Sequence, residues 1–326
     1  MTPGTPTTPV TPMTPGISGT AFRVGTRRSA LALTQARQVA AALERAGHRC
    51  ELVEVTTEGD RNRAPLASIG GQGVFTGALR EALLRKEIDV AVHSLKDLPT
   101  QNVDGIVLAA VPPREDPRDA LVARDGLRLA DLPAGARVGT GSPRRLAQLR
   151  LLREYDLELV EIRGNVDTRI RKVRDGELDA VVLARAGLTR LGRQDEITDT
   201  FDPTAFVPAP GQGALGIECR NSDEDVVRAL AGLDESRTRA AVTAERAVLA
   251  GIGAGCSAPM GAFAETTGGV EGDDLSLHAV VAAVDGSASV RLSTSGPLGD
   301  AEEIGRQLAA ALLAEGASRL IEERVT

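Results

Sequence analysis

Cys256 is the residue whose surroundings first point to chemistry. It stands in the run GIGAGCSAP, Gly251–Pro259, where its neighbours on both sides are small. Small side chains shield a sulfur little, so a large partner can approach it. Free cysteines are nonetheless usually inert core residues, and the pattern leaves both interpretations open.

Guanidinium groups are the second chemical feature, because of where they lie. They occur at or near predicted loops, as Arg27-Arg28, Arg144-Arg145, Arg163 and Arg169. Arginine binds carboxylate or phosphate through two parallel hydrogen bonds. Genomic base composition alone can enrich arginine, so placement rather than abundance carries the argument. An accessible thiol together with these groups predicts a covalently tethered polyanion.

Two of the arginine pairs open a predicted helix. In Arg137–Arg145 a strand, RVGT, runs into a helix with Ser142 as its N-cap and a proline as its first residue. Free N–H groups, the helix dipole and two guanidiniums make a seat for an anion. Thr26–Ser29 repeats this arrangement, with paired arginines beside a predicted N-cap serine. For one copy, solvated arginines beside an ordinary cap are the simpler explanation; the repetition favours anion binding.

A carboxylate follows a predicted buried strand. The stretch Val90–Pro99 reads VAVHSLKDLP. Asp97, beside Lys96 at a strand end that faces a cleft, fits a general acid or a group that stabilises a developing cation. The structural alternative is that Asp97 caps a turn before the proline. His93 fits a packed, hydrogen-bonded histidine better than a proton shuttle.

Two further motifs are weaker. In RGNVDTR, Arg163 and Arg169 flank a predicted helix start, and Asp167 could pair with either of them. The GGQG run at 70–73 is typical of a flexible lid and equally of a turn.

The spacing of apolar residues predicts an α/β protein. Strands are expected at Phe22–Thr26, Cys50–Thr56, Val90–Val92 and Gly105–Val111, with helices over Leu31–Leu43 and Gly77–Arg85. The RVGT of 23–26 recurs at 137–140, and EIDVAV at 87–92 has the counterpart ELDAVV at 177–182. Two echoes in the same order indicate two similarly built α/β domains.

Proline-rich segments divide the chain. The segments 112–117 and 207–213 are expected to link the two lobes twice, as in a hinged clamp whose site lies in the cleft. An α+β unit should follow, with helix Thr238–Ala250, strands Ser276–Val284 and Ala288–Ser293, and a closing helix Asp300–Glu323. We predict a disordered Thr/Pro-rich extension over 1–20, domain 1 over 21–113 with 213–232, domain 2 over 114–208 and domain 3 over 234–326.

Composition excludes several classes of protein. The 326 residues suffice for two or three cores, and no run approaches the roughly 20 apolar residues of a membrane span. A net charge of -7 and 2% aromatic residues argue against a nucleic-acid surface. Three cysteines without metal-ligand spacing indicate neither a disulfide framework nor a metal site. The N-terminus lacks the pattern of a signal peptide, so a cytoplasmic protein is expected.

Seven ordered motifs carry a family resemblance. The chain resembles porphobilinogen deaminase, also called hydroxymethylbilane synthase, from about residue 22 to the C-terminal helix. The motifs are GTRRSALA from Gly25, AVHSLKDLP from Ala91, REDPRD from Arg114, GTGSPRR from Gly139, RGNV from Arg163, GQGA from Gly211 and GCSAP from Gly255.

The resemblance implies a fold and an activity. It implies three domains, the first two of the type II periplasmic-binding kind, and a dipyrromethane cofactor linked to Cys256 through a thioether. It also implies a monomeric transferase of haem biosynthesis that joins four porphobilinogen molecules head to tail, losing ammonia each time, and releases linear hydroxymethylbilane by hydrolysis. Each pyrrole carries acetate and propionate arms, in agreement with the arginine clusters.

Residue roles follow from the same resemblance. It implies that Asp97 is catalytic, protonating or stabilising the pyrrole nitrogens, and that no metal is bound. The residues that it implies for binding cofactor and substrate are Arg27, Ser29, Gln35, Lys96, Thr140, Ser142, Arg144, Arg145, Arg163, Arg169, Arg190, Gln212 and Gly213.

The chain departs from the family in the lid. Many members have lysines around the glycine loop, where this sequence has Ser68, Gln72 and Gly77, so weaker electrostatic closure is expected. The clamp architecture by itself also fits a protein of another class, a non-catalytic two-lobed binder of a small dicarboxylate.

Overall fold

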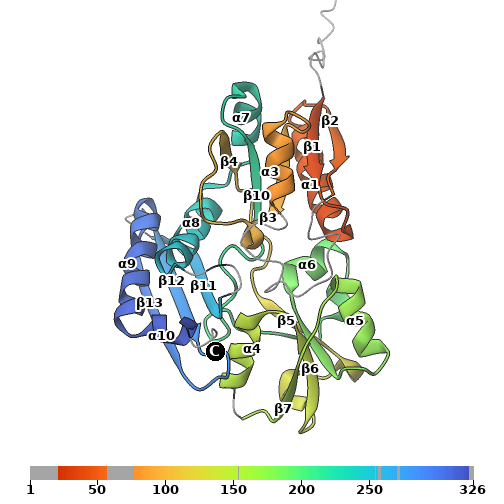
Figure 1. Cartoon of the computed structure of the whole chain (residues 1–326), viewed down its shortest axis with the longest axis vertical. Coiled ribbons are helices and arrows are strands. Elements are labelled where there is room, and N and C mark those ends of the chain that lie inside the picture. The colour runs from red at the N-terminus through yellow and green to blue at the C-terminus, as the bar shows by residue number, and fades with distance from the viewer. Residues whose placement is uncertain are drawn as a thin grey trace, which may run out of the picture.

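Three sheets organise the chain, and two of them share one design (Figure 1). The computed structural model describes residues 21–56, 76–152, 154–253, 255, 258–269 and 272–322. In these ranges the strands form two five-stranded mixed sheets and one three-stranded antiparallel sheet. None of the helices described has the length and apolar character that a membrane crossing needs.

Lobe 1 is built on the sheet β2-β1-β3-β10-β4. Strand β1 lies parallel to β2 and β3, whereas β10 runs antiparallel to both of its neighbours. Apolar residues of α1, spaced to lie on one helix face, join the sheet in one core. The elements are β1 Phe22–Thr26, α1 Ala30–Arg45, β2 Cys50–Glu54, α3 Gly77–Leu84, β3 Val90–Ser94, β4 Ile106–Ala110, β10 Leu215–Arg220 and α7 Glu224–Ala231.

Lobe 2 repeats this plan on the sheet β7-β6-β8-β5-β9. Strand β6 lies parallel to β7 and β8, and β5 is antiparallel to β8. The elements are β5 Asp119–Ala123, β6 Ala136–Thr140, α4 Pro143–Leu151, β7 Leu157–Glu161, α5 Val166–Arg174, β8 Ala180–Ala184, α6 Arg185–Arg190 and β9 Asp199–Thr200. In each sheet the fourth strand is the first one after a crossover from the other lobe.

The repeated sequence motifs make the same contacts in both lobes. The backbone N–H of Arg23 donates to Asp89 Oδ2 at 3.0 Å, and that of Arg137 donates to Asp179 Oδ2 at 2.7 Å. The N–H of each aspartate in turn donates to the carbonyl of its arginine. Burial raises the pKa of Asp89, but hydrogen bonds from the Arg23 side chain and backbone and from Arg220 lower it to about 2. The Arg137 backbone N–H lowers the pKa of Asp179. The two echoes therefore mark equivalent strand pairs.

The two crossovers touch each other between the lobes. The N–H of Glu115 on the first donates to the carbonyl of Gly213 on the second at 3.2 Å. Gly213 has a φ of +87°, and a Cβ there would lie 2.3 Å from the Glu115 carbonyl oxygen. Only glycine fits both conditions. The double link predicted from the prolines is confirmed, and it forms a compact hinge.

The third unit is an antiparallel sheet, β11-β12-β13, with helices on one face (Figure 1). Its core joins α8 and α9 to the strands. Helices α8 and α9 approach closely at Gly305, where a Cβ would lie 2.3 Å from the carbonyl oxygen of Ala244. The elements are α8 Ser236–Gly251, β11 Met260–Gly269, β12 Gly272–Ala282, β13 Ser289–Pro297, α9 Ala301–Ala314 and α10 Ala317–Glu322. With two α/β lobes and this smaller α+β unit, the predicted fold class is confirmed; the residue limits of the domains stay a prediction.

Two elements of the third unit differ from the sequence-based expectation. Strand β11 was not expected, because its Gly, Ala and Thr residues carry no clear alternation of apolar and polar side chains. The closing helix predicted over Asp300–Glu323 is wrong as a single helix: it ends at Ala314 and restarts at Ala317. Gly316, with a φ of +91°, makes the break.

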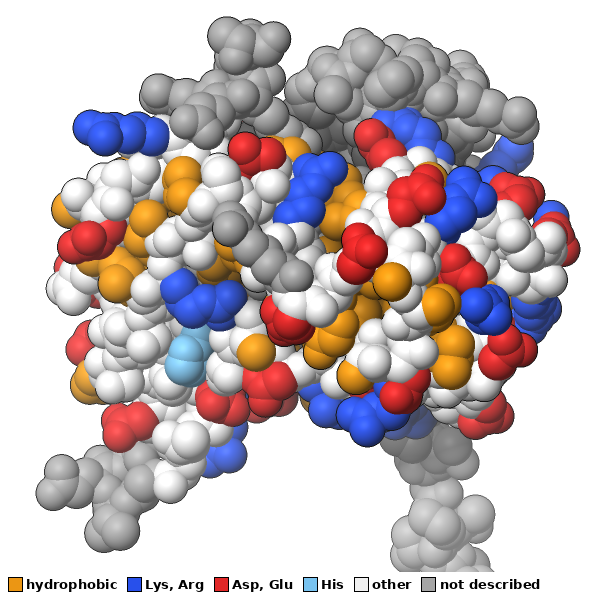
Figure 2. Space-filling model, turned by 90° about the horizontal axis from the view of Figure 1, so that it is seen from below, with side chains coloured by type: hydrophobic (Ala, Val, Ile, Leu, Met, Phe, Trp, Pro, Cys, Tyr) orange, Lys and Arg blue, Asp and Glu red, His pale blue; other side chains and the backbone are white. Residues whose placement is uncertain are grey.

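The surface of the described residues is mixed and polar. Leu84, 48% exposed, is the one large apolar side chain among them that faces solvent. Figure 2 shows charges of both signs interspersed over the face seen from below. Most large apolar side chains on the described part of the chain are therefore buried or only partly exposed.

A fully buried carboxylate ties the third unit to the hinge. Glu245 of α8 accepts hydrogen bonds from Arg114 on the first crossover at 2.7 and 3.0 Å, and from Gly211 N on the second at 2.6 Å. It also accepts from Ala264 N of β11 at 2.8 Å. One side chain thus holds both crossovers and the third sheet together.

Replacing Glu245 by alanine should destabilise the protein strongly. The change leaves the Arg114 guanidinium and two backbone N–H groups buried without their acceptor, for a loss of about 3–5 kcal/mol in the free energy of unfolding. Thermal and denaturant unfolding measure it. Glu265→Ala, at an exposed position of β11, is the control and should change stability by less than about 0.5 kcal/mol. Equal effects of the two changes would contradict this account.

Candidate active site

Each lobe presents the N-terminus of a helix to the region between the lobes. Ser29 caps α1 by accepting from Ala32 N at 3.2 Å, and Ser142 caps α4 by accepting from Arg145 N at 3.5 Å. Pro143 is the first residue of α4. Both N-caps predicted from the sequence are confirmed.

A pocket in lobe 1 brings together several predicted site residues. It is a cavity of about 90 Å³ whose lining includes Arg27, Ser29, Gln35 and Asp97. Gln35 is buried and exchanges hydrogen bonds with Ser94, its Nε2 lying 2.9 Å from the hydroxyl oxygen. The α1 terminus and the end of β3 therefore form one polar pocket with Asp97 at its edge.

Asp97 is held by its backbone and leaves its carboxylate exposed. It ends a single 3-10 turn, Leu95–Asp97, that directly follows β3. Leu95 N donates to the Ala214 carbonyl at 3.0 Å, and Arg246 of α8 donates to the carbonyls of Leu98 and Pro99, both at 2.8 Å. Among the described residues no hydrogen bond reaches the Asp97 carboxylate, which argues against a turn cap as its role.

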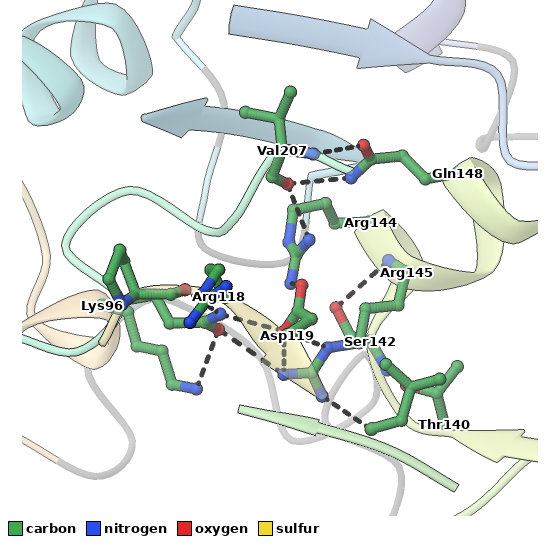
Figure 3. Close-up of polar contacts among 12 residues, drawn as sticks. Lys96, Arg118, Asp119, Thr140, Ser142, Arg144, Arg145, Gln148 and Val207 are labelled. Carbon is green, nitrogen blue, oxygen red and sulfur yellow. Dashed lines mark hydrogen bonds and ion pairs between the residues drawn. The ribbon is translucent and has the colours of Figure 1, made fainter. Parts of the chain in front are cut away.

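The second part of the site is a cluster of cations around Asp119, where the crossovers meet lobe 2 (Figure 3). Asp119 is fully buried. Its Oδ2 lies 2.8 Å from Arg144 Nη2, and its Oδ1 lies 2.7 Å from Arg145 Nη2 and 2.9 Å from Gln212 Nε2. The Oε1 of Gln212 is 3.5 Å from Lys96 Nζ. Residues of both lobes and of the second crossover thus converge on one carboxylate.

Positive charge exceeds negative charge in this cluster. Burial, together with the nearby Arg145 and Arg144, lowers the pKa of Lys96 to about 8, although Asp97 and Asp119 oppose the shift. Burial and then repulsion by Arg145 and Arg163 lower the pKa of Arg169 to about 10. The pKa of Asp119 is about 2, because the two guanidiniums outweigh the effect of its burial. Cations forced together in this way favour an anionic ligand.

Arg169 and Arg163 extend the cluster along the start of α5. The Nε of Arg169 donates to the Gly164 carbonyl at 2.8 Å, and Asn165 caps the helix through Thr168 N. The sequence suggested that Asp167 could pair with one of these arginines, but it pairs with neither. It contacts Arg193 at 2.5 Å instead, so Asp167 is not the counterion of Arg169.

Other predicted residues have mainly internal contacts. Thr140 is buried at the end of β6, with its hydroxyl 3.3 Å from Ser142 N. Arg190 donates to the Gly213 carbonyl at 2.7 Å and so braces the hinge. Arg144, only 3% exposed, donates to the Val207 carbonyl at 2.7 Å as well as contacting Asp119.

Cys256, Ser68 and Gln72 lie outside the described residues. Gly77 begins α3.

Sequence reasoning missed Asp119 as a member of the site. A buried aspartate in the run DALVA carries no pattern that separates it from a surface residue at a strand start. The available signal was indirect: two adjacent arginines on an amphipathic helix require a counterion if they are buried.

Two family models match this chain. Residues 22–228 match the porphobilinogen deaminase dipyrromethane cofactor binding domain, and residues 239–314 match the porphobilinogen deaminase C-terminal domain.

Curated relatives agree with the family models. Porphobilinogen deaminase 1 of Streptomyces coelicolor is 56% identical over 313 residues, which are 93% of this chain and 98% of that protein. Porphobilinogen deaminase of Mycobacterium bovis is 55% identical over 304 residues, 92% of this chain and 98% of that protein. Among solved structures, the methionine binding protein MetQ is similar with a TM-score of 0.42 at 14% identity, covering 65% of this chain and 89% of that one.

The resemblance drawn from the seven motifs is therefore confirmed by matches that span both lobes and the third unit. The chain belongs to the porphobilinogen deaminase family, transferases that polymerise porphobilinogen and carry dipyrromethane as cofactor.

Proposed function

We propose that this chain joins four porphobilinogen molecules head to tail on a dipyrromethane primer held by Cys256, with Asp97 as the catalytic carboxylate, and releases hydroxymethylbilane by hydrolysis. The observation that carries the proposal is the excess of cations around Asp119: Arg144 and Arg145 are buried, and Lys96 and Arg169 are half-buried.

The residues around Asp119 fit a dipyrromethane with acidic arms. Lys96, Arg145 and Arg169 repel one another in the absence of an anion, and the acetate and propionate groups of the cofactor would neutralise them. The Nε of Arg144 is buried without a hydrogen-bond partner among the described residues. When bound, the cofactor supplies the ring carbon to which the first porphobilinogen is joined.

Burial supports a division of roles between the lobes. Arg144 and Arg145 are 3% and 5% exposed and are locked by Asp119, which suits a ligand that stays. Arg27 and Ser29 are only partly buried and line an open pocket beside Asp97, which suits a ligand that enters and leaves. We assign the lobe 2 cluster mainly to cofactor carboxylates and the lobe 1 pocket mainly to substrate carboxylates.

Asp97 lies between the lobe 1 pocket and the lobe 2 cluster, so it can act on pyrrole rings of both substrate and cofactor. Its carboxylate is exposed, its backbone is held from lobe 1 and α8, and Lys96 next to it belongs to the cation cluster. In this role Asp97 stabilises positive charge on a pyrrole nitrogen as ammonia leaves. Lys96 holds a carboxylate arm so that the ring stays in line with Asp97.

Cys256 is proposed as the attachment point because it stands among small residues in the GCSAP motif, and residues on both sides of it make backbone hydrogen bonds. The N–H of Ala258 donates to the Gly255 carbonyl at 2.9 Å, and Ala282 N donates to the Pro259 carbonyl at 3.1 Å. In the attachment, sulfur replaces the amino group on the aminomethyl carbon of porphobilinogen: the C–N bond breaks, an S–C bond forms, and the thiol proton leaves with ammonia.

We also propose that the protein is a cytoplasmic monomer that binds no nucleic acid. The mixed surface, with Leu84 as its single large exposed apolar side chain in the described ranges, offers no apolar face for a stable dimer. The net charge of -7 disfavours a polyanionic partner.

Intact mass under denaturing conditions tests the attachment. The purified protein should be heavier than its sequence by two pyrrole units, and Cys256→Ser should remove the whole increment. Cys50→Ser is the matched control and should retain it. A binding protein of the rival class would carry no increment in any variant, which would refute the proposal.

Replacing Asp97 by asparagine keeps the shape of the side chain and removes its charge. We expect the two-ring increment to remain and kcat to fall at least about 100-fold, because the developing cation loses its partner. Asp104→Asn, at an exposed position of the same lobe, should keep normal turnover. Product formation by the Asp97 variant at more than about a tenth of the normal rate would refute its role.

The low pKa of Lys96 predicts a pH dependence of cofactor loading. Lys96 is charged below its pKa of about 8 and neutral above it, so its attraction for carboxylates fades as the pH rises through 8. Arginine keeps its charge throughout this range. The loading rate of the apoprotein relative to that of Lys96→Arg should therefore fall several-fold between about pH 7 and about pH 9. Thiol ionisation affects both proteins equally, and a constant ratio would exclude this role for Lys96.

A further inference from the structure

The second crossover begins with a segment that lies between lobe 2 and the third unit. Val207, fully buried, contacts α4 on one side and β11 on the other. Strand β11 starts at Met260, shortly after Cys256 in the chain. Val207 therefore connects α4, which carries part of the cation cluster, to the start of β11.

Gln148 of α4 binds both backbone groups of Val207. Its Nε2 donates to the Val207 carbonyl at 2.9 Å, and its Oε1 accepts from Val207 N at 2.8 Å. The side chain is 3% exposed, and Figure 3 shows its amide facing Val207 in the manner of a neighbouring strand. Arg144, one helical turn earlier, donates to the same carbonyl at 2.7 Å. The helix that carries the cation cluster thus fixes this residue by three hydrogen bonds.

Strand β11 packs closely against the other side of the same segment. A Cβ at Gly261 would lie 2.4 Å from the Val207 carbonyl oxygen and 2.9 Å from that of Pro208. Ala262 N donates to the Pro208 carbonyl at 3.0 Å. The side chains of Val207, Phe263 and Val280 form one buried cluster. A shift of Val207 must therefore move the start of β11 or break these contacts.

We propose that Gln148 is a positioning residue for cofactor attachment: through Val207 it sets the register between the arginines of α4 and the start of β11, the strand that follows Cys256 in the chain. The inference rests on the proposed function, in which Cys256 carries dipyrromethane. Gln148 itself touches neither substrate nor cofactor in this account. Its contribution is to the rate at which the thiol and the anion site come together productively.

The test compares loading of apoproteins with porphobilinogen, followed by intact mass at timed intervals. Gln148→Met keeps the helix propensity and nearly the volume of the side chain but removes both hydrogen bonds, leaving Val207 N without a partner. We expect the two-ring increment to appear about tenfold more slowly than in the unmodified chain. The site arginines remain, so the KM for porphobilinogen of the variant once loaded should stay within about twofold of normal.

A second variant separates positioning from loss of stability. Ile170→Ala removes core volume in lobe 2 in a cluster that does not include Val207, and it should lower the unfolding temperature at least as much. If the Ile170 variant loads at the normal rate while Gln148→Met loads slowly, the inference stands. Normal loading by Gln148→Met, or equal slowing in both variants, overturns it. Failure of the unmodified chain to gain mass at Cys256 would instead overturn the proposed function.

Discussion

The site depends on one buried carboxylate that is outnumbered by cations. Asp119 is fully enclosed and satisfies Arg144 and Arg145 at once, at 2.8 and 2.7 Å. Without it, two guanidiniums would lie unpaired in the interior, at a cost that a marginally stable protein cannot sustain. With it alone, Lys96 and Arg169 still lie beside other cations, and burial followed by these like charges lowers the pKa of each. The folded chain thus has a net positive charge around Asp119, and an anionic ligand neutralises that charge.

The hinge connects the charges around Asp119 to all three parts of the molecule. Asp119 is the first residue of β5, directly after the first crossover, and Gln212 of the second crossover donates to it. Lys96 of lobe 1 reaches the same amide, so both lobes and both crossovers meet within a few ångströms. Glu245 then joins the crossovers to the third unit through four hydrogen bonds. Neutralising the cluster therefore acts where the relative positions of all three parts are determined.

The sequence predicted the framework well because the framework rests on local rules. The strand-to-helix junctions at Ser29 and Ser142 follow from cap chemistry, and the repeated motifs imply two equivalent strand pairs. The double crossover followed from prolines. The break at Gly316 was missed because a glycine at a helix end and one tolerated inside a helix look alike in sequence. Strand β11 was missed because its residues are small and it is defined by pairing with β12.

The site was predicted in its residue types but not in its internal pairing. The motifs named the arginines, and the structure brings Arg27, Ser29, Gln35 and Asp97 to one pocket. The sequence could not indicate which arginine side chains already have hydrogen-bond partners within the protein. Arg190 ends α6 and Arg144 lies in the first turn of α4, where side chains are often exposed, yet they donate to the carbonyls of Gly213 and Val207. Such partners are backbone atoms, which carry no sequence signature, and they become visible only when the crossover is folded against α4 and α6.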